Sequence, residues 1–340
     1  MSKLKLTDIA AALGISPATV SKALKGYSDV NADTRKRILD YTQQVGFKPQ
    51  YKASSLRTGK SGTIGVILPS LQNLYFLEVL EALVEAANKV DLLIIPLSSH
   101  ESIEQEQQHI NTLSHYGVDA IFLSLTQETA DINHLEQIQN SRVPVFLFDK
   151  ISKQLNRPKF FVDDRKAAYE ATRHLIDQGC RRIAHFRVSL LAQTSIDRFL
   201  GYREALDASE LPYDKNLVFV SNRGTQTEGT EFVQELLNQK MSFDGIFAIN
   251  DELAIGAMKA LKTADISIPN EVAVVGFSNS ILSKTVSPQL TTVDQGPVQI
   301  AESMIDAFLK YPSSAEGDPK IENLTIIPTA LVIRESSRRN

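Results

Sequence analysis

The sequence has little cysteine and no long apolar run. Among 340 residues there is one cysteine, Cys180, and six histidines are scattered along the chain. These numbers exclude a disulfide framework, and no zinc-ligand cluster can be assembled from them. No apolar run approaches the roughly 18 residues that span a membrane, and the first residues lack a signal-peptide pattern. We therefore expect a soluble cytoplasmic protein, without a metal and without a cofactor.

What the sequence does contain is enough apolar material for large cores and an uneven distribution of charge. It is 43% hydrophobic and 22% charged, so 340 residues can form two or three domains. Residues 1–62 carry eleven Lys or Arg against four Asp, a surplus of seven positive charges. Because the whole chain has a net charge of −4, the remainder has a surplus of eleven negative charges. This asymmetry indicates that the N-terminal part contacts a polyanion such as DNA.

Three short helices are predicted in this basic N-terminal part, and two of them follow from apolar spacing. Residues 6–13 carry an apolar stripe with the helical repeat, and Gly14 ends it. A further stripe of Ile38, Tyr41 and Val45 predicts a helix that ends at Gly46.

Between these two helices, residues 16–26 specify a short helix with both of its ends. Ser16 can accept a hydrogen bond from the free amides, Pro17 suits the first helical position, and Gly26 can adopt the left-handed conformation. The tight turn before it predicts a helix-turn-helix whose second helix enters the major groove, where small outward side chains permit close approach. A helical domain that binds protein is the alternative, which the positive charge disfavours.

The segment PQYKASSLRTGKSGT, residues 49–63, is polar and basic. Any helix in it is shorter than the roughly 12 residues that are stable alone in water. We expect it to become ordered on binding, with Leu56 as an apolar wedge in the minor groove beside its twin from a second subunit. A flexible linker is the alternative interpretation.

From residue 63 onward, apolar runs of strand length alternate with helical patterns. Such alternation indicates parallel sheets wound right-handedly with helices on both faces, and the number of strands favours two sheets. The predicted strands span residues 63–68, 92–97, 120–125, 145–149, 160–163, 183–188, 217–221, 245–249 and 272–277. The predicted helices span residues 76–88, 104–116, 167–178, 198–208, 228–238, 253–263 and 298–309.

Polar side chains that follow the predicted strands are candidates for a ligand site, because parallel sheets bind ligands at the carboxyl ends of their strands. They are Ser70, Ser124, Asp149, Asn222, Asn250, Asp251, Ser278 and Asn279, joined by Arg198 at a helix start. We interpret Ser70 and Asp164 as cap or turn residues. No nucleophile or acid–base constellation stands out, so a binding cleft is favoured over an enzyme.

Several motifs resemble those of the lactose-repressor family of bacterial transcription regulators. They are TDIAAALGISPATVSKALKG, GFKP, ASSLRTGKSGTIGVILP, AINDELAIGAMKAL, VAVVGF and SPQLTTVDQ. The resemblance implies an all-α helix-turn-helix DNA-binding head at 1–49, a hinge at 50–62, and an α/β periplasmic-binding-protein-like effector domain at 63–340. That domain would have two doubly wound parallel-sheet lobes crossed three times by the chain. Lobe 1 would be approximately 63–160 and 293–322, and lobe 2 approximately 161–292 and 323–340.

The resemblance also implies roles for residues at matching positions. Pro17, Ala18 and Lys22 would read bases, whereas Thr19 and Ser21 would contact phosphates. The residues expected to bind DNA are Thr7, Ser16, Pro17, Ala18, Thr19, Ser21, Lys22, Lys25, Ala53 and Leu56. The residues expected to bind the effector are Tyr75, Phe76, Ser124, Asp149, Arg198, Asn250, Ser278 and Gln295.

The sequence departs from the family pattern in three places. Ser278 stands where many relatives have an aspartate, Arg223 and Gly224 stand where an aromatic is common, and Ser54 replaces a usual arginine. The first two departures favour an anionic or phosphorylated effector over a plain neutral sugar.

Together these expectations describe a homodimeric, nucleoid-associated transcription repressor whose near-palindromic operator is double-stranded DNA. The affinity of the repressor for this operator would be set by a small-molecule effector of the sugar or sugar-derivative class. The sequence leaves open a tetramer, the sign of the effector's action, and activation in place of repression. A cytoplasmic solute-binding protein without DNA function is the main alternative, which the basic head disfavours. A sugar-processing enzyme is a second alternative, for which the catalytic residues are missing.

Overall fold

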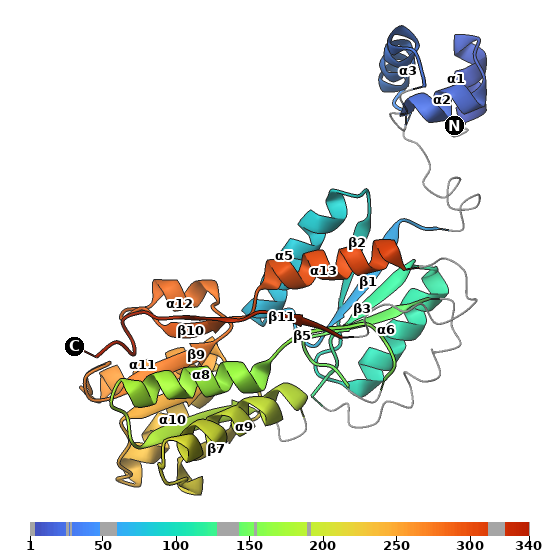
Figure 1. The fold of residues 1–340 in the computed structure, drawn as a ribbon. Helices are drawn as coiled ribbons and strands as arrows, with labels where there is room; N and C mark the ends of the chain where they lie inside the picture. Colours follow the sequence, from blue (N-terminus) through green and yellow to red (C-terminus); the bar gives the residue numbers. More distant parts are fainter. Residues whose placement is uncertain are drawn as a thin grey trace. The chain divides into compact units, whose positions relative to one another are not determined.

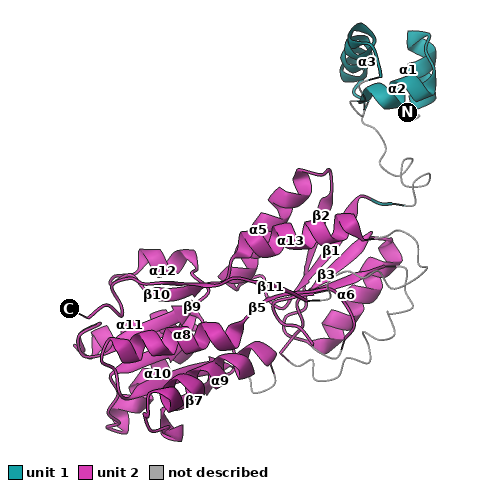
Figure 2. Ribbon diagram, in the orientation of Figure 1, with its two compact units in different colours: residues 1–61 teal, residues 62–340 magenta. Residues whose placement is uncertain are grey.

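The computed structural model describes residues 4–24, 27, 29–47, 60–127, 143–152, 155–188, 192–311 and 324–339. The chain divides into two compact units, residues 1–61 and residues 62–340, which we call the head and the body (Figures 1 and 2). Lys25, Gly26, Ala53, Ser54 and Leu56 lie outside the described residues. Over the part of the chain that is described, no helix has the length and apolarity needed to cross a membrane.

The head contains the three predicted helices, α1 (Leu6–Leu13), α2 (Pro17–Leu24) and α3 (Ala32–Gln44). Gly14 ends α1 in the left-handed conformation, with φ of 67°. The three helices share one small core, whose fully or nearly fully buried members are Ile9, Ala10, Val20, Ala23, Val30 and Ile38.

The first lobe of the body is built on a parallel six-stranded sheet in the order β11-β5-β4-β3-β1-β2. Its strands are β1 (Thr63–Leu68), β2 (Leu93–Ser98), β3 (Ala120–Leu123), β4 (Val145–Phe148), β5 (Lys159–Val162) and β11 (Leu324–Ile327). Helices α5 (Leu74–Asn88) and α13 (Pro297–Lys310) cover one face, and α6 (Ile103–Tyr116) covers the other. Successive side chains of β1 point to opposite faces of the sheet, so Val66 is buried in the core on one face and Ile67 in the core on the other.

The second lobe has a six-stranded sheet in the order β12-β10-β9-β8-β6-β7, in which only the β10–β12 pair is antiparallel. Its strands are β6 (Ile183–Val188), β7 (Val218–Ser221), β8 (Gly245–Ala248), β9 (Ala273–Phe277), β10 (Thr291–Asp294) and β12 (Ala330–Val332). Helices α8 (Asp164–Asp177) and α9 (Gln193–Ala208) cover one face; α10 (Gln226–Asn238) and α11 (Asp251–Thr263) cover the other. The short helices η2 (Lys215–Leu217) and α12 (Ile281–Thr285) complete it.

Helices α10 and α11 touch along their backbones, and this contact needs glycine. A Cβ atom on Gly256 would lie 1.9 Å from the carbonyl oxygen of Gln226, and one on Gly229 would lie 2.2 Å from that of Leu253. Because neither carbonyl can move away without opening a helix, the two helix starts are held at a fixed separation.

All nine predicted strands are present within two residues, which confirms the two-sheet prediction. Helices α8 and α9 begin three and five residues earlier than predicted, because their first turns are polar and carry no apolar stripe. Strands β10, β11 and β12 and helix α12 were not predicted, since they have only three to five residues each.

The chain passes between the two sheets three times, but the predicted crossing points need correction. Residues 161 and 162 still belong to β5 in the first lobe. Residues 293 and 294, which were assigned to the first lobe, belong to β10 in the second. The assignment of residues 323–340 to the second lobe is wrong at its start, because β11 pairs with β5 from Leu324↔Lys159 to Ile327↔Val162. Two residues separate β11 from β12, and these two strands lie in different sheets.

Candidate functional site

Helix α2 of the head has the cap that its sequence predicts. The Oγ atom of Ser16 accepts a hydrogen bond from the backbone N–H of Thr19 at 3.1 Å, and Pro17 is the first helical residue. Val20 and Ala23 are buried against the other helices. The side chains predicted to face outward are therefore accessible: Pro17, Ala18 and Lys22 are exposed, and Thr19 and Ser21 are half-buried.

Lys22 forms an ion pair with Asp29 on the surface of the head. The Asp29 carboxylate raises the pKa of Lys22, and the Lys22 ammonium lowers the pKa of Asp29. Both side chains are about half exposed, at 52% and 54%. An exposed ion pair contributes little to stability, so Lys22 can leave Asp29 for another acceptor at little cost. Thr7, on α1, is also exposed.

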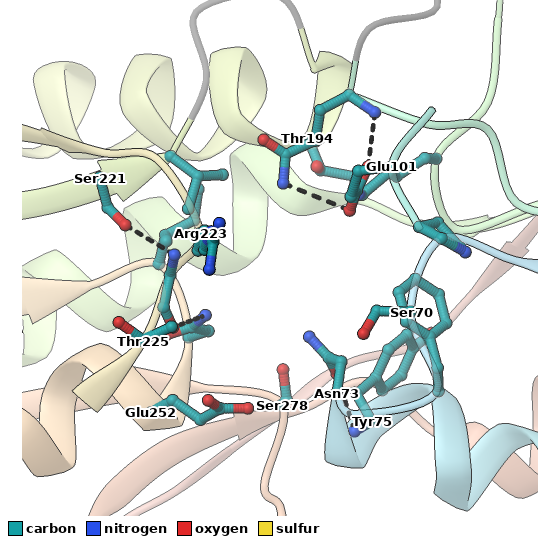
Figure 3. Close-up of a pocket in the computed structure, with 18 of the residues that line it drawn as sticks. Ser70, Asn73, Tyr75, Glu101, Thr194, Ser221, Arg223, Thr225, Glu252 and Ser278 are labelled. Carbon is teal, nitrogen blue, oxygen red and sulfur yellow. Dashed lines mark hydrogen bonds and ion pairs between the residues drawn. The ribbon is translucent and has the colours of Figure 1, made fainter. Parts of the chain in front are cut away.

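A cavity of about 840 Å³ opens in the body and is lined by residues from both lobes (Figure 3). Its size lies within the range of small-molecule sites. Seven of the eight residues expected to bind an effector line it: Tyr75, Phe76, Asp149, Arg198, Asn250, Ser278 and Gln295. Ser70 and Asn222, from the wider strand-end set, also line it.

Ser124 does not line the cavity. Its backbone N–H donates to the carbonyl of Ile67 at 3.1 Å, so the chain at Ser124 still continues the β1–β3 ladder. Its side chain is completely buried, and its hydroxyl has no partner among the described residues. Ser124 directly follows β3, as predicted, but its buried side chain does not reach the cavity.

Asp251 and Asn279 are also away from the cavity and have structural roles. The Asp251 carboxylate accepts from the Thr292 hydroxyl at 2.5 Å and from the Ser280 N–H at 2.7 Å. The Asn279 amide donates to Asp294 at 2.9 Å. These bonds tie α11 and the turn after β9 to β10.

Several cavity residues have backbone conformations that L-amino acids rarely adopt. His100, Glu101, Asp149 and Ser278 have φ values of 50°, 59°, 56° and 114°, and each follows a strand within three residues. Such strain costs about 1–3 kcal/mol per residue and is found where a structure holds functional groups in place.

Arg198 is buried on the cavity wall and is largely engaged within the protein. Its Nε donates to Asp164 at 2.7 Å and its Nη1 donates to the Ile249 carbonyl at 2.6 Å. Its guanidinium lies 3.7 Å from the centroid of the Phe277 ring. Burial raises the pKa of Asp164 to about 7, against the opposing effect of Arg198. The interpretation of Asp164 as a helix cap is wrong, because Asp163 caps α8 by accepting from the Lys166 N–H.

Two buried polar atoms on the cavity wall have no hydrogen-bond partner among the described residues. They are the Tyr75 hydroxyl and the Nε2 of Gln295, whose side chains are 5% and 1% exposed. The Oε1 of Gln295 accepts from the Ser278 hydroxyl at 2.9 Å, which leaves the amide nitrogen available. Burial raises the pKa of Tyr75 well above its usual value, so the phenol stays protonated and can donate.

Asp149 lies close to these two groups in the same wall, and its carboxyl interacts electrostatically with both, although neither donor reaches it with hydrogen-bond geometry. Burial raises the pKa of its carboxyl, and Arg198 and Lys150 lower it. Buried polar groups are usually paired, so an acceptor beside unpartnered donors marks a place where a polar ligand can bind.

The loop 221–225 of the second lobe is fixed by a network centred on Glu228. That carboxylate accepts from the N–H groups of Asn222 at 2.7 Å and Thr225 at 3.0 Å, and from the Thr225 hydroxyl at 3.0 Å. Burial alone would raise the pKa of Glu228, but these hydrogen bonds lower it to about 2.

Asn250 completes this network. Its Oδ1 caps α11 by accepting from the Leu253 N–H at 2.8 Å, and its Nδ2 donates to the Gly224 carbonyl at 3.0 Å. The residue therefore holds the loop against α11. Ser70 likewise forms a turn by accepting from the Gln72 N–H at 3.0 Å, as predicted.

Several polar residues of the cavity were not predicted, because they lie in loops two or more residues beyond the strands or inside helices. Glu101 is an example: it accepts from Lys150 Nζ at 2.6 Å and from the Gln127 N–H at 2.7 Å. The others include Asn73, Lys150, Thr194 and Glu252. A longer window after each strand would have found Glu101 and Lys150.

Comparisons with known proteins agree with this architecture. A family model described as bacterial regulatory proteins of the lacI family matches residues 5–50, and one described as a periplasmic binding protein-like domain matches residues 172–337. Catabolite control protein A of Priestia megaterium is 30% identical over 97% of this chain and 98% of its own. The transcriptional regulator RegA of Clostridium saccharobutylicum is 28% identical over 98% of both chains. The lac repressor dimer bound to operator has a TM-score of 0.84 at 20% identity, over 99% of both chains, which shows a shared fold.

Proposed function

The chain belongs to the lacI family of bacterial regulatory proteins, and from this premise we propose that it is a transcription repressor whose operator affinity is set by an effector in the interlobe cavity. The family membership predicted from the motifs is thereby confirmed, and with it a role in DNA-binding transcription regulation. One observation carries the proposal: the same chain contains an accessible, capped helix α2 and a cavity with buried, unpartnered polar groups.

On this proposal, two heads related by a two-fold axis bind a near-palindromic operator in the cytoplasm, at the nucleoid. Each α2 enters the major groove of one half-site. Pro17 and Ala18 allow close approach, and Lys22 exchanges Asp29 for a base edge. Ala53 and Leu56, which lie outside the described residues, contact the minor groove of the specific, bent site on this proposal. A dimer is the minimal assembly, and a tetramer would add a second pair of heads.

The body supplies the regulation. The two lobes contact one another through a hydrogen bond from the Ile281 N–H on α12 to Glu78 on α5, at 3.2 Å. An effector that binds one arrangement of the lobes more tightly shifts the population toward it. A coupling of about 1–3 kcal/mol would change operator affinity by roughly 5–150-fold. We propose a sugar or sugar derivative as the effector.

The proposal is tested by selecting bound duplexes from a random pool with the full-length protein, with and without a metabolite library. We expect one near-palindromic sequence to be enriched, and its enrichment to change with a single class of metabolite. A body that binds metabolites while the protein enriches no sequence would favour the alternative, a solute-binding protein.

Lys22→Ala sharpens the test, because a base contact and a phosphate contact respond differently. We expect it to weaken binding to the selected site more than binding to random DNA. Lys36→Ala removes another exposed cation, from α3, and serves as the matched control. Equal losses on both kinds of DNA for Lys22→Ala would mean that Lys22 contacts phosphate only.

A further inference from the structure

The charged residues of the cavity wall are not equally available to a ligand. Of the three cations that line it, Lys150 is paired with Glu101 at 2.6 Å and Arg198 is paired with Asp164 at 2.7 Å. Arg223 is exposed, and its guanidinium has no hydrogen bond or ion pair with any residue that the structure describes. It is therefore the cation on this wall that is free to bind an anion.

The backbone that carries Arg223 is held rigidly. The N–H of Arg223 itself donates to the Glu228 carboxylate at 3.3 Å, and its neighbours Asn222 and Thr225 donate to the same group. The Gly224 N–H donates to the Ser221 hydroxyl at 2.6 Å. Gly224 has φ of 72°, and a Cβ there would lie 2.6 Å from Asn250 Nδ2, so this turn is specific to glycine. A free guanidinium on a fixed loop loses little backbone entropy when it binds.

The opposite side of the cavity has a different chemistry. Figure 3 shows Tyr75 and Asn73 on the first-lobe side, facing Arg223 and Thr225 on the second-lobe side. The unpartnered Tyr75 hydroxyl and Gln295 amide are donors, and Asp149 beside them is an acceptor. This combination suits hydroxyl groups, which both donate and accept.

Glu252 also lines the cavity, and it does not cancel Arg223. No ion pair within 4.0 Å joins these two side chains. Burial raises the pKa of Glu252.

We propose that the effector is a polyhydroxylated molecule with a single anionic group, a phosphate or a carboxylate. The anion binds Arg223, and the hydroxyl groups bind Tyr75, Gln295 and Asp149. A planar guanidinium can hold either anion with two parallel hydrogen bonds. The proposal rests on the proposed function, because it names the ligand class of the same cavity. On this proposal, Arg223 is the residue that makes the cavity bind anionic ligands more tightly than neutral ones.

The test is calorimetry on the full-length protein in phosphate-free buffer with four probes: glucose, glucose 6-phosphate, gluconate and inorganic phosphate. We expect the anionic probes to bind and glucose to bind more weakly. Glucose 6-phosphate and gluconate distinguish phosphate from carboxylate. Arg223→Gln should lower the affinity for the bound anion by about 10-fold or more, since a charge-assisted hydrogen bond contributes about 1.5–3 kcal/mol.

Matched variants separate a contact from a general charge effect. Arg223→Lys should keep part of the anion affinity, and Arg173→Gln, which removes an exposed arginine of α8 outside the cavity, should keep all of it. Tyr75→Phe should weaken glucose 6-phosphate more than inorganic phosphate, because only the sugar has hydroxyl groups to lose.

The proposal is overturned if Arg223→Gln binds the anions as tightly as the wild-type protein does. It is also overturned if no anion of the panel binds at millimolar concentration. Neither result affects the selection of an operator from random DNA, so a failure of the ligand class is distinguishable from a failure of the proposed function.

Discussion

The head and the body place their functional side chains in opposite ways. In the head, one short helix presents small and basic residues to solvent, and six buried side chains support it. In the body, the cavity residues come from strand ends, loops and helices, and several are buried. Two of them, Tyr75 and Gln295, are 220 positions apart in the sequence. The head therefore depends on local sequence, whereas the cavity depends on the whole topology of two sheets.

The difference has a consequence for stability. A unit as small as the head has few core residues, so each contributes a large share of its stability. The body spreads its stability over four hydrophobic clusters, two in each lobe. Substitutions should therefore abolish DNA binding more easily than they abolish ligand binding.

The largest effect is expected for Ile38→Ala in the head core. Ile38 is completely buried, and removing its side chain should cost about 2–5 kcal/mol. We expect operator binding to be lost, as measured by fluorescence anisotropy, while anion binding to the cavity is retained. Leu39→Ala is the matched control, because Leu39 is 45% exposed on the same helix. Equal losses of operator binding in both variants would contradict the prediction that the stability of the head depends on a few buried residues.

A smaller effect is expected for Gly224→Ala in the cavity loop. The left-handed φ of 72° and the contact with Asn250 should together lower the free energy of unfolding of the body by about 1–3 kcal/mol. Anion affinity should fall as well, because Arg223 is displaced. Gly117→Ala is the control: Gly117 has φ of 71° and nothing within 4 Å of an added Cβ. A similar loss of unfolding free energy in both variants would show that the contact between residue 224 and Asn250 is unimportant.

Asp251→Asn should change the pH dependence of body stability. Burial raises the pKa of Asp251 from 3.8 to about 6, so between these values the folded protein keeps a proton that the unfolded chain has released. In the wild-type protein this group makes the free energy of unfolding fall as pH rises through that window, by up to about 1.4 kcal/mol per pH unit. The variant lacks this contribution. Urea denaturation at several pH values measures the difference. If the free energy of unfolding depends on pH in the same way for both proteins, the raised pKa of Asp251 is contradicted.

The smallest effect is expected for Ser16→Ala at the start of α2. The Thr19 N–H loses its acceptor, which should lower head stability by about 1 kcal/mol. Thermal unfolding of the protein without DNA measures this. Ser16→Asn should restore the loss, because asparagine also caps helices, and a variant that fails to restore it would point to another cause.

The same comparison explains which parts of the fold and of the cavity could be predicted from the sequence alone. Ser16, Pro17 and Gly14 act on neighbours within three or four residues, so the three helices of the head, the Ser16 cap of α2 and the Gly14 end of α1 could be predicted. Nine of the twelve described strands could also be predicted, because their apolar runs are visible in a short window, whereas the short strands β10, β11 and β12 could not. Of the nine candidates chosen from strand ends and one helix start, six line the cavity, since strand ends meet at one edge of a sheet. Tyr75, Phe76 and Gln295 also line it, but they were expected only from the family resemblance.

What could not be predicted depends on contacts between distant residues. The burial of the Ser124 side chain keeps it out of the cavity, and the bond to Asp164 decides that Arg198 is not free. The pairing of Lys150 with Glu101, which leaves Arg223 as the free cation, is equally remote in the sequence. None of these follows from a local pattern.

The neighbouring strands β11 and β12 have a consequence for how the protein is made. Each is an edge strand, one for each sheet, and both come from residues 324–332. Arg334 and Ser336 then add hydrogen bonds to the Leu290 and Val274 carbonyls of the second lobe. Neither lobe can be finished on the ribosome until these late residues have left the exit tunnel. A nascent chain is thus able to form the three helices of the head well before the cavity of the body is complete.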